Sequence, residues 1–171
     1  GLAPTSSTTA TLVLGDILAV ALLERKGFTK TDFNRRHPGG KLGSFLMKVS
    51  ELMHKGNEMP LVPETATMQE ALLEMTSKML GCVGITDTGG HLKGIITDGD
   101  LRRKMSNDIL NKKAAEVMTP NPKTTVPDIL AAEALKIMNS TGKGITMLFV
   151  IENDKPVGII HMHDCLRAGV A

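Results

Sequence analysis

Two stretches of the chain repeat one another at a spacing of 63 to 65 residues, and this repeat constrains the fold more than any other feature. Gly94-Ile95-Ile96 returns as Gly158-Ile159-Ile160, and Asp100 returns as Asp164. The other matches are Glu51 with Glu116, Met53 with Met118, Val62-Pro63 with Val126-Pro127, Glu70-Ala71-Leu72 with Glu133-Ala134-Leu135, and Met75 with Met138. A near-constant period indicates two copies of one supersecondary unit, which bury their apolar faces together.

Both copies predict the same order of elements, β-α-β-β-α. Copy one predicts a strand at 61–62, a helix with a Thr67–Glu70 capping box, strands at 82–86 and 92–97, and a short helix from about residue 99. Copy two predicts a strand at 125–126, a less clearly capped helix, strands at 145–151 and 156–161, and a short helix from about residue 163. A unit of about 60 residues is marginal alone. We therefore expect an α/β (α+β) fold in which the two sheets stack and leave clefts along the seam.

Composition excludes several classes of protein. The four Phe are the only aromatic residues and the net charge is +2, which argues against a nucleic-acid surface. Cys82 and Cys165 have no CxxC spacing, so we expect two buried, reduced thiols in a cytosolic protein. The apolar stretch 10–23 is broken by Gly15 and Asp16, and is predicted to be too short to span a membrane.

Residues 1–46 do not belong to the repeat. Their apolar spacing predicts a helix capped by Thr8 or Thr9 that stops near Gly27, followed by a turn at 35–40. One helix and a loop cannot form a core. Since the chain starts at Gly1 in a run rich in Pro, Ser and Thr, we expect a fragment whose upstream part is missing. The helix is then expected to pack either on that missing part or on the rest of the chain.

The repeat resembles a pair of CBS motifs, the tandem module called a Bateman domain. The resemblance covers about residues 47–171 and rests on the paired GII-x-x-x-D endings, with one motif at 47–108 and the second at 109–171. It implies binding of adenosyl or other nucleotide-like ligands in the clefts, and regulation of an attached enzyme or transporter.

The junction Thr97-Asp98-Gly99-Asp100 is the first candidate ligand site. Thr97 ends a predicted strand, and free N–H groups of the following helix can hold a phosphate. Asp100 can accept hydrogen bonds from two ribose hydroxyls. Alternatively, Asp100 only supports the first turn of its helix, and Arg102-Arg103 only form a solvated face. We expect both Asp100 and Asp164 at solvent-accessible helix starts, where the fold tolerates their replacement.

Copy two differs at this junction, because His161 stands where copy one has Thr97, and His163 precedes Asp164. These imidazoles can meet a phosphate or carboxylate of a ligand. Alternatively, they are two partly exposed histidines at a helix start. The three residues are too close together to form a complete set of metal ligands without further partners, so we expect no metal site. No cofactor is expected either.

A second resemblance involves residues 2–10, 14–16 and 37–43, which look like the end of a sugar-isomerase (SIS) domain. They resemble the junction in D-arabinose 5-phosphate isomerases, which carry an SIS domain followed by two CBS motifs. Residues 97–103 and 158–170 match that family too. The resemblance implies that residues 1–46 end a truncated SIS domain. It also implies that the parent protein interconverts ribulose 5-phosphate and arabinose 5-phosphate for synthesis of the lipopolysaccharide sugar Kdo, in the bacterial cytoplasm.

The same resemblance implies that His37, in the His-Pro-Gly-Gly turn, is the base that moves a proton between C1 and C2. From the residues alone, His37 is a solvated loop histidine. Sugar phosphate is expected to bind only in the intact SIS domain, so this chain alone should be inactive.

Partners follow from the CBS resemblance. We expect a nucleotide or CMP-Kdo in the cleft, and a homodimer, or a tetramer in the intact enzyme, through helices near 101–105 and 165–168. No nucleic acid or membrane partner is expected. The alternatives are a nucleotide-binding module of another SIS-type sugar-phosphate protein, or a dimerisation surface without a ligand.

Overall fold

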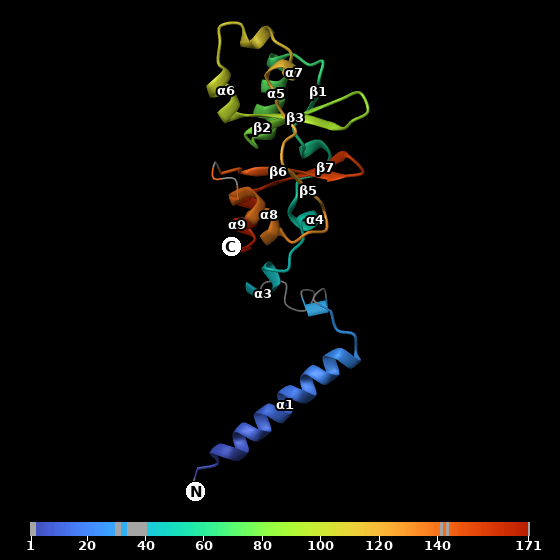
Figure 1. The fold of residues 1–171 in the computed structure, drawn as a ribbon, viewed down its shortest axis with the longest axis vertical. Helices are drawn as coiled ribbons and strands as arrows, with labels where there is room; N and C mark the ends of the chain where they lie inside the picture. Colours follow the sequence, from blue (N-terminus) through green and yellow to red (C-terminus); the bar gives the residue numbers. More distant parts are fainter. Residues whose placement is uncertain (1–2, 30–31, 34–40, 141, 143, 171) are drawn as a thin grey trace.

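Two small sheets stack face to face in the computed structural model, which describes residues 3–29, 32–33, 41–140, 142 and 144–170 (Figure 1). The first sheet has the order β1 (Leu61–Pro63), β2 (Cys82–Thr86), β3 (Leu92–Thr97) and β4 (Thr119–Pro120). The second has the order β5 (Thr124–Thr125), β6 (Met147–Glu152) and β7 (Lys155–His161). In each sheet the first two strands are parallel and the next pair is antiparallel.

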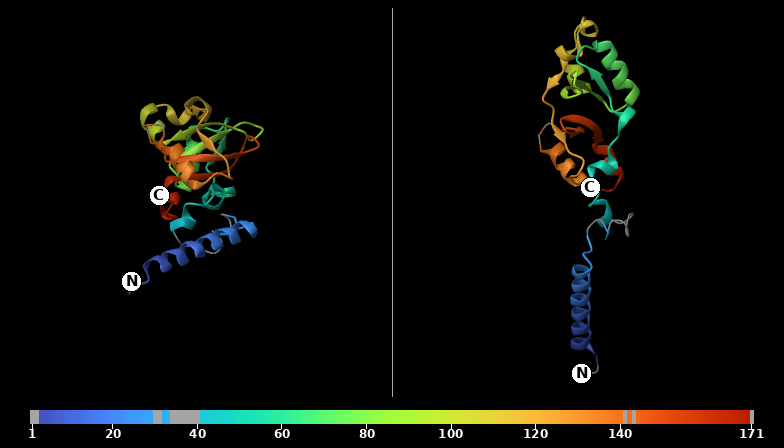
Figure 2. Two further views of the ribbon diagram at one scale, coloured as in Figure 1. Left: turned by 60° about the horizontal axis from the view of Figure 1, so that its bottom comes forward. Right: turned by 90° about the vertical axis from the view of Figure 1, so that its right-hand side faces the viewer.

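Helices cover the outer faces of both sheets, so that each copy forms a β-α-β-β-α layer (Figure 2). Copy one (residues 47–108) carries α4 (Val49–Leu52), α5 (Met68–Lys78), α6 (Asp98–Lys104) and a 3₁₀ turn at Gly56–Glu58. Copy two (residues 109–171) carries a 3₁₀ turn at Ile109–Asn111, α7 (Ala114–Val117), α8 (Ala131–Asn139) and α9 (Met162–Arg167). The predicted fold class is confirmed.

Local sequence signals explain where the longer helices begin and end. The predicted capping box of α5 is present: the Thr67 N–H donates to Glu70 Oε2 at 2.7 Å, and the Glu70 N–H donates to Thr67 Oγ1 at 3.3 Å. The helix buries Met68, Ala71 and Met75. Its counterpart α8 begins after Leu130, which offers no side-chain cap.

The leading segment of each copy, residues 49–58 in copy one and 114–120 in copy two, packs on the sheet of the other copy, a reciprocal exchange that the sequence did not predict. In copy two, β4 pairs with β3, and a Cβ added at Gly94 would lie 2.4 Å from the Met118 sulfur. In copy one, His54 forms an isolated bridge with Ile159 on β7. There, a Cβ added at Gly158 would lie 2.4 Å from the Met53 sulfur. The repeated glycines therefore give the two methionines room to cross the sheets.

Apolar side chains fill the space between the sheets, with Cys82, Met147, Phe149 and Ile159 at the centre. Both cysteines are buried and free, as predicted. Burial raises the pKa of the Cys82 thiol to about 12 and that of Cys165 to about 11, so both stay protonated.

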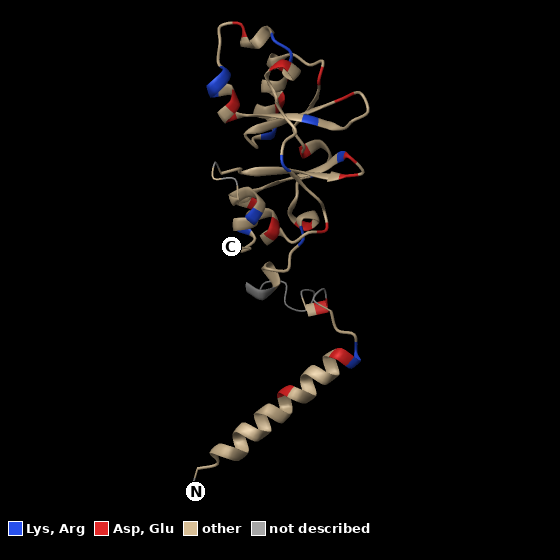
Figure 3. Ribbon diagram, viewed as in Figure 1, with Lys and Arg blue, Asp and Glu red and all other residues tan. Residues whose placement is uncertain are grey.

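The N-terminal helix α1 (Thr5–Arg25) differs from the prediction at its start. It begins at Thr5, after Pro4, and Thr8 Oγ1 donates to the Pro4 carbonyl at 2.7 Å instead of capping the helix. It ends as predicted, before Gly27, which has a left-handed φ of 60°. No residue of α1 is buried, and few of its residues are charged (Figure 3).

The 21 residues of α1 also overturn the expectation that this stretch is too short to span a membrane. By length and composition, α1 qualifies as a membrane-crossing helix. The core helices of soluble proteins meet the same criteria. The helix extends beyond the apolar stretch 10–23 at both ends, mainly at its start, and these additional residues make it long enough.

Candidate functional site

A cavity of ≈ 1090 Å³ opens where α6 and α9 begin, and residues of both copies line it. Copy one contributes Thr97, Asp98, Gly99 and Asp100, and copy two contributes His161 and His163. The fold thus brings together every predicted ligand-binding residue except Asp164, which is not among the lining residues. The cationic residues of the lining are Arg102, Arg103 and Lys123.

Asp100 is buried in the wall of the cavity, and both oxygens of its carboxylate accept hydrogen bonds. Oδ2 accepts hydrogen bonds from the Thr97 N–H at 3.0 Å and from Thr97 Oγ1 at 2.7 Å. Oδ1 accepts from Arg103 Nη2 at 2.8 Å and from Thr119 Oγ1 at 3.1 Å. Asp100 is only 5% exposed, so the expectation of a solvent-accessible carboxylate is wrong. Its burial and its bonds argue against the expectation that the fold tolerates its replacement. The capping box and the exchanged β4 segment bury it together.

These contacts also set the charge of Asp100. Burial raises the pKa of its carboxyl, but the hydrogen bonds from Thr97, Arg103 and Thr119 outweigh burial and lower the pKa below its ordinary value. Asp100 therefore stays ionised at neutral pH. A ribose hydroxyl that bonds to it has to displace one of the present donors, and Arg103, with a side chain 70% exposed, is the least constrained.

The start of α6 offers fewer open N–H groups than predicted. The Asp98 N–H donates to the Gly81 carbonyl at 3.1 Å, and the Asp100 N–H donates to Thr97 Oγ1 at 3.2 Å. Two of the first three amides of this seven-residue helix are therefore already bonded. Side chains are better placed than the helix start to bind an anion in this cavity.

Asp164 is the counterpart of Asp100, and an imidazole holds it from the other copy. His54 Nε2 lies 3.0 Å from Asp164 Oδ2, and His54 Nδ1 lies 3.2 Å from Glu58 Oε2. Arg167 bonds to Asp164 Oδ1, as Arg103 does to Asp100. Although burial raises the pKa of Asp164, the bonds from His54 and Arg167 lower it overall.

Sequence reasoning missed His54. The signal was present, because Met53 and Met118 match in the repeat and the residues that follow them are His54 and Thr119. Both of these residues bond to the aspartate of the opposite copy. Recognising that role required the reciprocal exchange of the leading segments.

His161 caps α9 with its ring. Its Nδ1 accepts a hydrogen bond from the His163 N–H at 3.1 Å, and the two rings stack with centroids 5.0 Å apart. Burial lowers the pKa of His161, and the positive charges of His163 and Arg167 lower it further, against the opposing effect of Asp164. His161 is therefore neutral at pH 7 and above, while its ring remains at the cavity wall.

The remaining predictions concern a metal site and the catalytic base. Within the described ranges, no three His, Cys, Asp or Glu side chains form a group that could hold a metal ion. His37, the predicted catalytic base, lies outside the residues that the structure describes.

Comparison with known families and proteins gives matches along the whole chain. The family profile described as CBS domain matches residues 49–107 and 114–171. Arabinose 5-phosphate isomerase KdsD of Yersinia pestis and that of Escherichia coli (strain K12) are each 53% identical over 173 residues. These matches cover 99% of this chain and 52% of each relative, so the chain spans about half the length of the curated relatives it matches.

Solved structures show the same fold at lower identity. A "putative acetoin utilization protein (AcuB)" from Vibrio cholerae superposes with a TM-score of 0.63 at 24% identity, covering 73% of this chain and 91% of that one. CBSX2 in complex with AMP superposes with a TM-score of 0.61 at 21% identity, covering 72% of this chain and 96% of that one.

Proposed function

Because this chain belongs to the CBS-domain family, we propose that its two motifs, at 47–108 and 109–171, form a nucleotide-sensing regulatory module. The observation that carries the proposal is the shared cavity, which is lined by a buried carboxylate, Asp100, and by three cationic side chains. Ribose hydroxyls bond well to carboxylates, and phosphates bond to Arg and Lys. The AMP complex of CBSX2, a protein of the same fold, supports this ligand class.

Binding at Asp100 requires an exchange of partners. The ribose takes the place of Arg103 at Oδ1, while Thr97 keeps its two bonds to Oδ2. The released guanidinium, together with Arg102 and Lys123, then pairs with the ligand phosphate. The site thus gains a ribose contact and a phosphate contact through the movement of one exposed side chain.

The parent protein is proposed to be an arabinose 5-phosphate isomerase, because relatives of that name are 53% identical and about twice as long. Residues 1–46 would then end the sugar-isomerase domain, and the missing upstream half would cover α1. Between residues 10 and 23 the apolar residues of α1 lie around the whole helix instead of along one face, and such a helix is normally buried. Its large exposed apolar residues are Leu12, Val13, Leu14, Ile17, Leu18, Val20, Leu22 and Leu23.

In this proposal the intact enzyme interconverts ribulose 5-phosphate and arabinose 5-phosphate in the bacterial cytoplasm, for Kdo synthesis. His37 moves the proton between C1 and C2 through an enediol. This chain alone is inactive, since the sugar-phosphate site requires the upstream half. His37→Ala in the full-length enzyme should remove most of the turnover at unchanged melting temperature, and an unimpaired variant would place the base elsewhere.

The ligand of the cavity is either an adenine nucleotide or the activated end product CMP-Kdo, which would act as a feedback inhibitor. Thermal denaturation with AMP, ATP, CMP and CMP-Kdo separates these ligands, because a compound that binds only the native state raises the melting temperature. A rise with one of them, lost in Arg103→Ala together with Lys123→Ala, supports the module. No rise with any of the four contradicts it.

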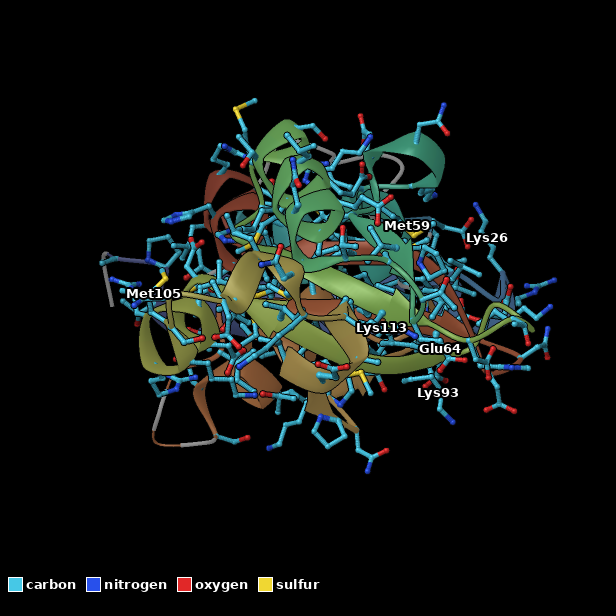
Figure 4. The ribbon with its side chains drawn as sticks, turned by 90° about the horizontal axis from the view of Figure 1, so that it is seen from above. Lys26, Met59, Glu64, Lys93, Met105 and Lys113 are labelled. Carbon is cyan, nitrogen blue, oxygen red and sulfur yellow. The ribbon has the colours of Figure 1, made fainter. Side chains whose placement is uncertain are left out.

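A dimerisation surface is the second candidate function, and exposed apolar residues at the ends of α6 and α9 favour it. Met105 is 67% exposed and stands at the outer edge of the molecule, and Leu166 is 47% exposed (Figure 4). Pairing of these helices across a two-fold axis would cover both. Light scattering of Met105→Glu and of the unmodified chain tests this, and a monomer for both at high concentration rules the dimer out.

A further inference from the structure

We propose that His161 and His163 form an acid-recognising end of the cavity, which selects nucleotides carrying an additional anionic group and takes up protons when they bind. The inference rests on the proposed nucleotide function and assigns a different part of the ligand to each end of the cavity. One end holds the nucleoside at Asp100, and the other holds a carboxylate or second phosphate at the imidazoles.

The hydrogen bond within the pair fixes the tautomer of His161. Since Nδ1 accepts the His163 N–H, the ring proton of the neutral form lies on Nε2. His161 therefore presents a donor even when uncharged, and protonation has to break its bond as a helix cap. An anion that bonds to the ring compensates for that loss.

No carboxylate of copy two is left to neutralise the pair among the described residues near it. His161 faces His163, Asp164 and Arg167 from its own helix, and His54 from the leading segment of copy one. Asp164 already accepts bonds from His54 and Arg167 as well as from the His161 N–H, and Glu58 bonds to His54. Asp98 of copy one also lines the cavity, but its charge is not among those that shift the pKa of His161. We therefore assign the counter-ion of a protonated His161 to the ligand.

The stacked geometry makes this need stronger. With the ring centroids 5.0 Å apart, a charge on His163 disfavours a charge on His161. A bound anion opposes that effect and raises the pKa of His161, so the complex holds more protons than the free chain. Affinity for an acidic ligand should therefore increase as the pH falls through the ordinary histidine range of about 6.5.

Two phosphodiester probes isolate the acid-recognising end. CMP-N-acetylneuraminate carries a sugar carboxylate, whereas the methyl ester of CMP has the same nucleoside and phosphodiester without it. Neither probe changes charge between pH 6 and pH 8, so a pH effect on its affinity comes from the protein. Calorimetry in buffers of different ionisation enthalpy counts the protons taken up.

The expected result is that CMP-N-acetylneuraminate binds about 10-fold tighter at pH 6 than at pH 8, the factor that one unit of pKa shift provides. Proton uptake should accompany this binding. The double variant His161→Asn/His163→Gln should lose the pH effect, and Asn retains the capacity to cap α9. His91→Gln, which changes a histidine on the β2–β3 hairpin outside the cavity, is the matched control and should behave as the unmodified chain.

The outcomes separate this inference from the proposed function. If AMP, CMP and both probes all fail to bind, the nucleotide function itself is wrong. If any nucleotide binds, but the carboxylate gives no advantage at pH 6 or the double variant keeps the pH effect, the acid-recognising end is overturned while nucleotide binding stands.

Discussion

The two copies place the same aspartate and arginine in their last helix, α6 or α9, but surround them with different chemistry. In copy one, hydroxyls of Thr97 and Thr119 bond to Asp100, whereas in copy two His54 takes the place of Thr119 at Asp164. His161 likewise replaces Thr97 as the cap. The aspartate–arginine pair is therefore the structural part of each junction. Copy two has imidazoles where copy one has hydroxyls. The copy-two end of the cavity can therefore change its charge with pH, whereas the hydroxyls of copy one cannot.

Removing each aspartate is the strongest way to test that comparison. Asp100→Ala leaves the Thr97 N–H and Thr119 hydroxyl without their acceptor, and should lower the free energy of unfolding by about 2–3 kcal/mol. Nucleotide affinity should fall roughly 10- to 100-fold, since a charge-assisted ribose contact is lost. Asp164→Ala should affect binding less, because Asp164 is not in the cavity lining.

Urea unfolding followed by circular dichroism measures the stability change, because the chain has no Trp or Tyr. Asp98→Ala is the control, as Asp98 begins the same helix but is exposed. Equal unfolding free energies for Asp100→Ala and Asp98→Ala would show that the Asp100 carboxylate does not hold the junction together.

The two copies can also be compared at Gly94 and Gly158, which lie against Met118 and Met53, with a smaller expected effect on stability. Gly94→Ala and Gly158→Ala each force a Cβ to 2.4 Å from a methionine sulfur, so each should cost about 1–3 kcal/mol of stability. At each site the added Cβ also meets an atom at 3.0 Å that side-chain rotation cannot move, the Met118 Cβ at Gly94 and the His54 backbone carbonyl at Gly158. Met118→Ala and Met53→Ala should therefore each relieve only part of the cost of the paired glycine substitution. Complete relief in either pair would contradict this account.

Acidification should lower the stability of the chain through His161 of copy two, which has no titratable counterpart in copy one. Its pKa is lowered in the folded chain, mainly by burial, so the unfolded chain binds the proton more readily. The stability contribution is complete above the ordinary histidine pKa and is lost as the pH falls through that value towards the lower folded one. Urea unfolding at pH 7.5 and pH 5.5 should therefore show a smaller loss for His161→Thr than for the unmodified chain. An identical loss would remove His161 as the source.

The arginines should give the smallest effect. Arg103 and Arg167 have side chains 70% and 75% exposed, so replacing either by Ala should cost no more than about 1 kcal/mol. Ligand binding should distinguish them, because only Arg103 lines the cavity. Calorimetry with the nucleotide identified by thermal denaturation would show weaker binding for Arg103→Ala alone. Equal weakening by both variants would show that Arg167 also contributes to ligand binding, which would contradict this account.

Short-range signals carried the successful sequence predictions. Strands β2 and β3 have the predicted bounds, and the Thr67–Glu70 capping box forms as expected. The start of α1 was missed because Thr8 and Thr9 bond back to carbonyls within the helix, an alternative open to any threonine near a helix end. Sequence reasoning also could not choose between Asp100 as a ligand contact and as a support of its helix. The structure gives it the second role, and the first is the proposal.

By itself, the sequence determined the repeat, the order of elements in each copy and the junction residues, because capping and apolar periodicity act over a few residues. Only the tertiary structure decided which sheet each leading segment joins, and hence which aspartate each partner reaches. His54 and Asp164 are separated by 110 residues along the chain, and no local pattern links them. The burial of Asp100 depends in the same way on Thr119, which the exchange of the leading segments brings to it.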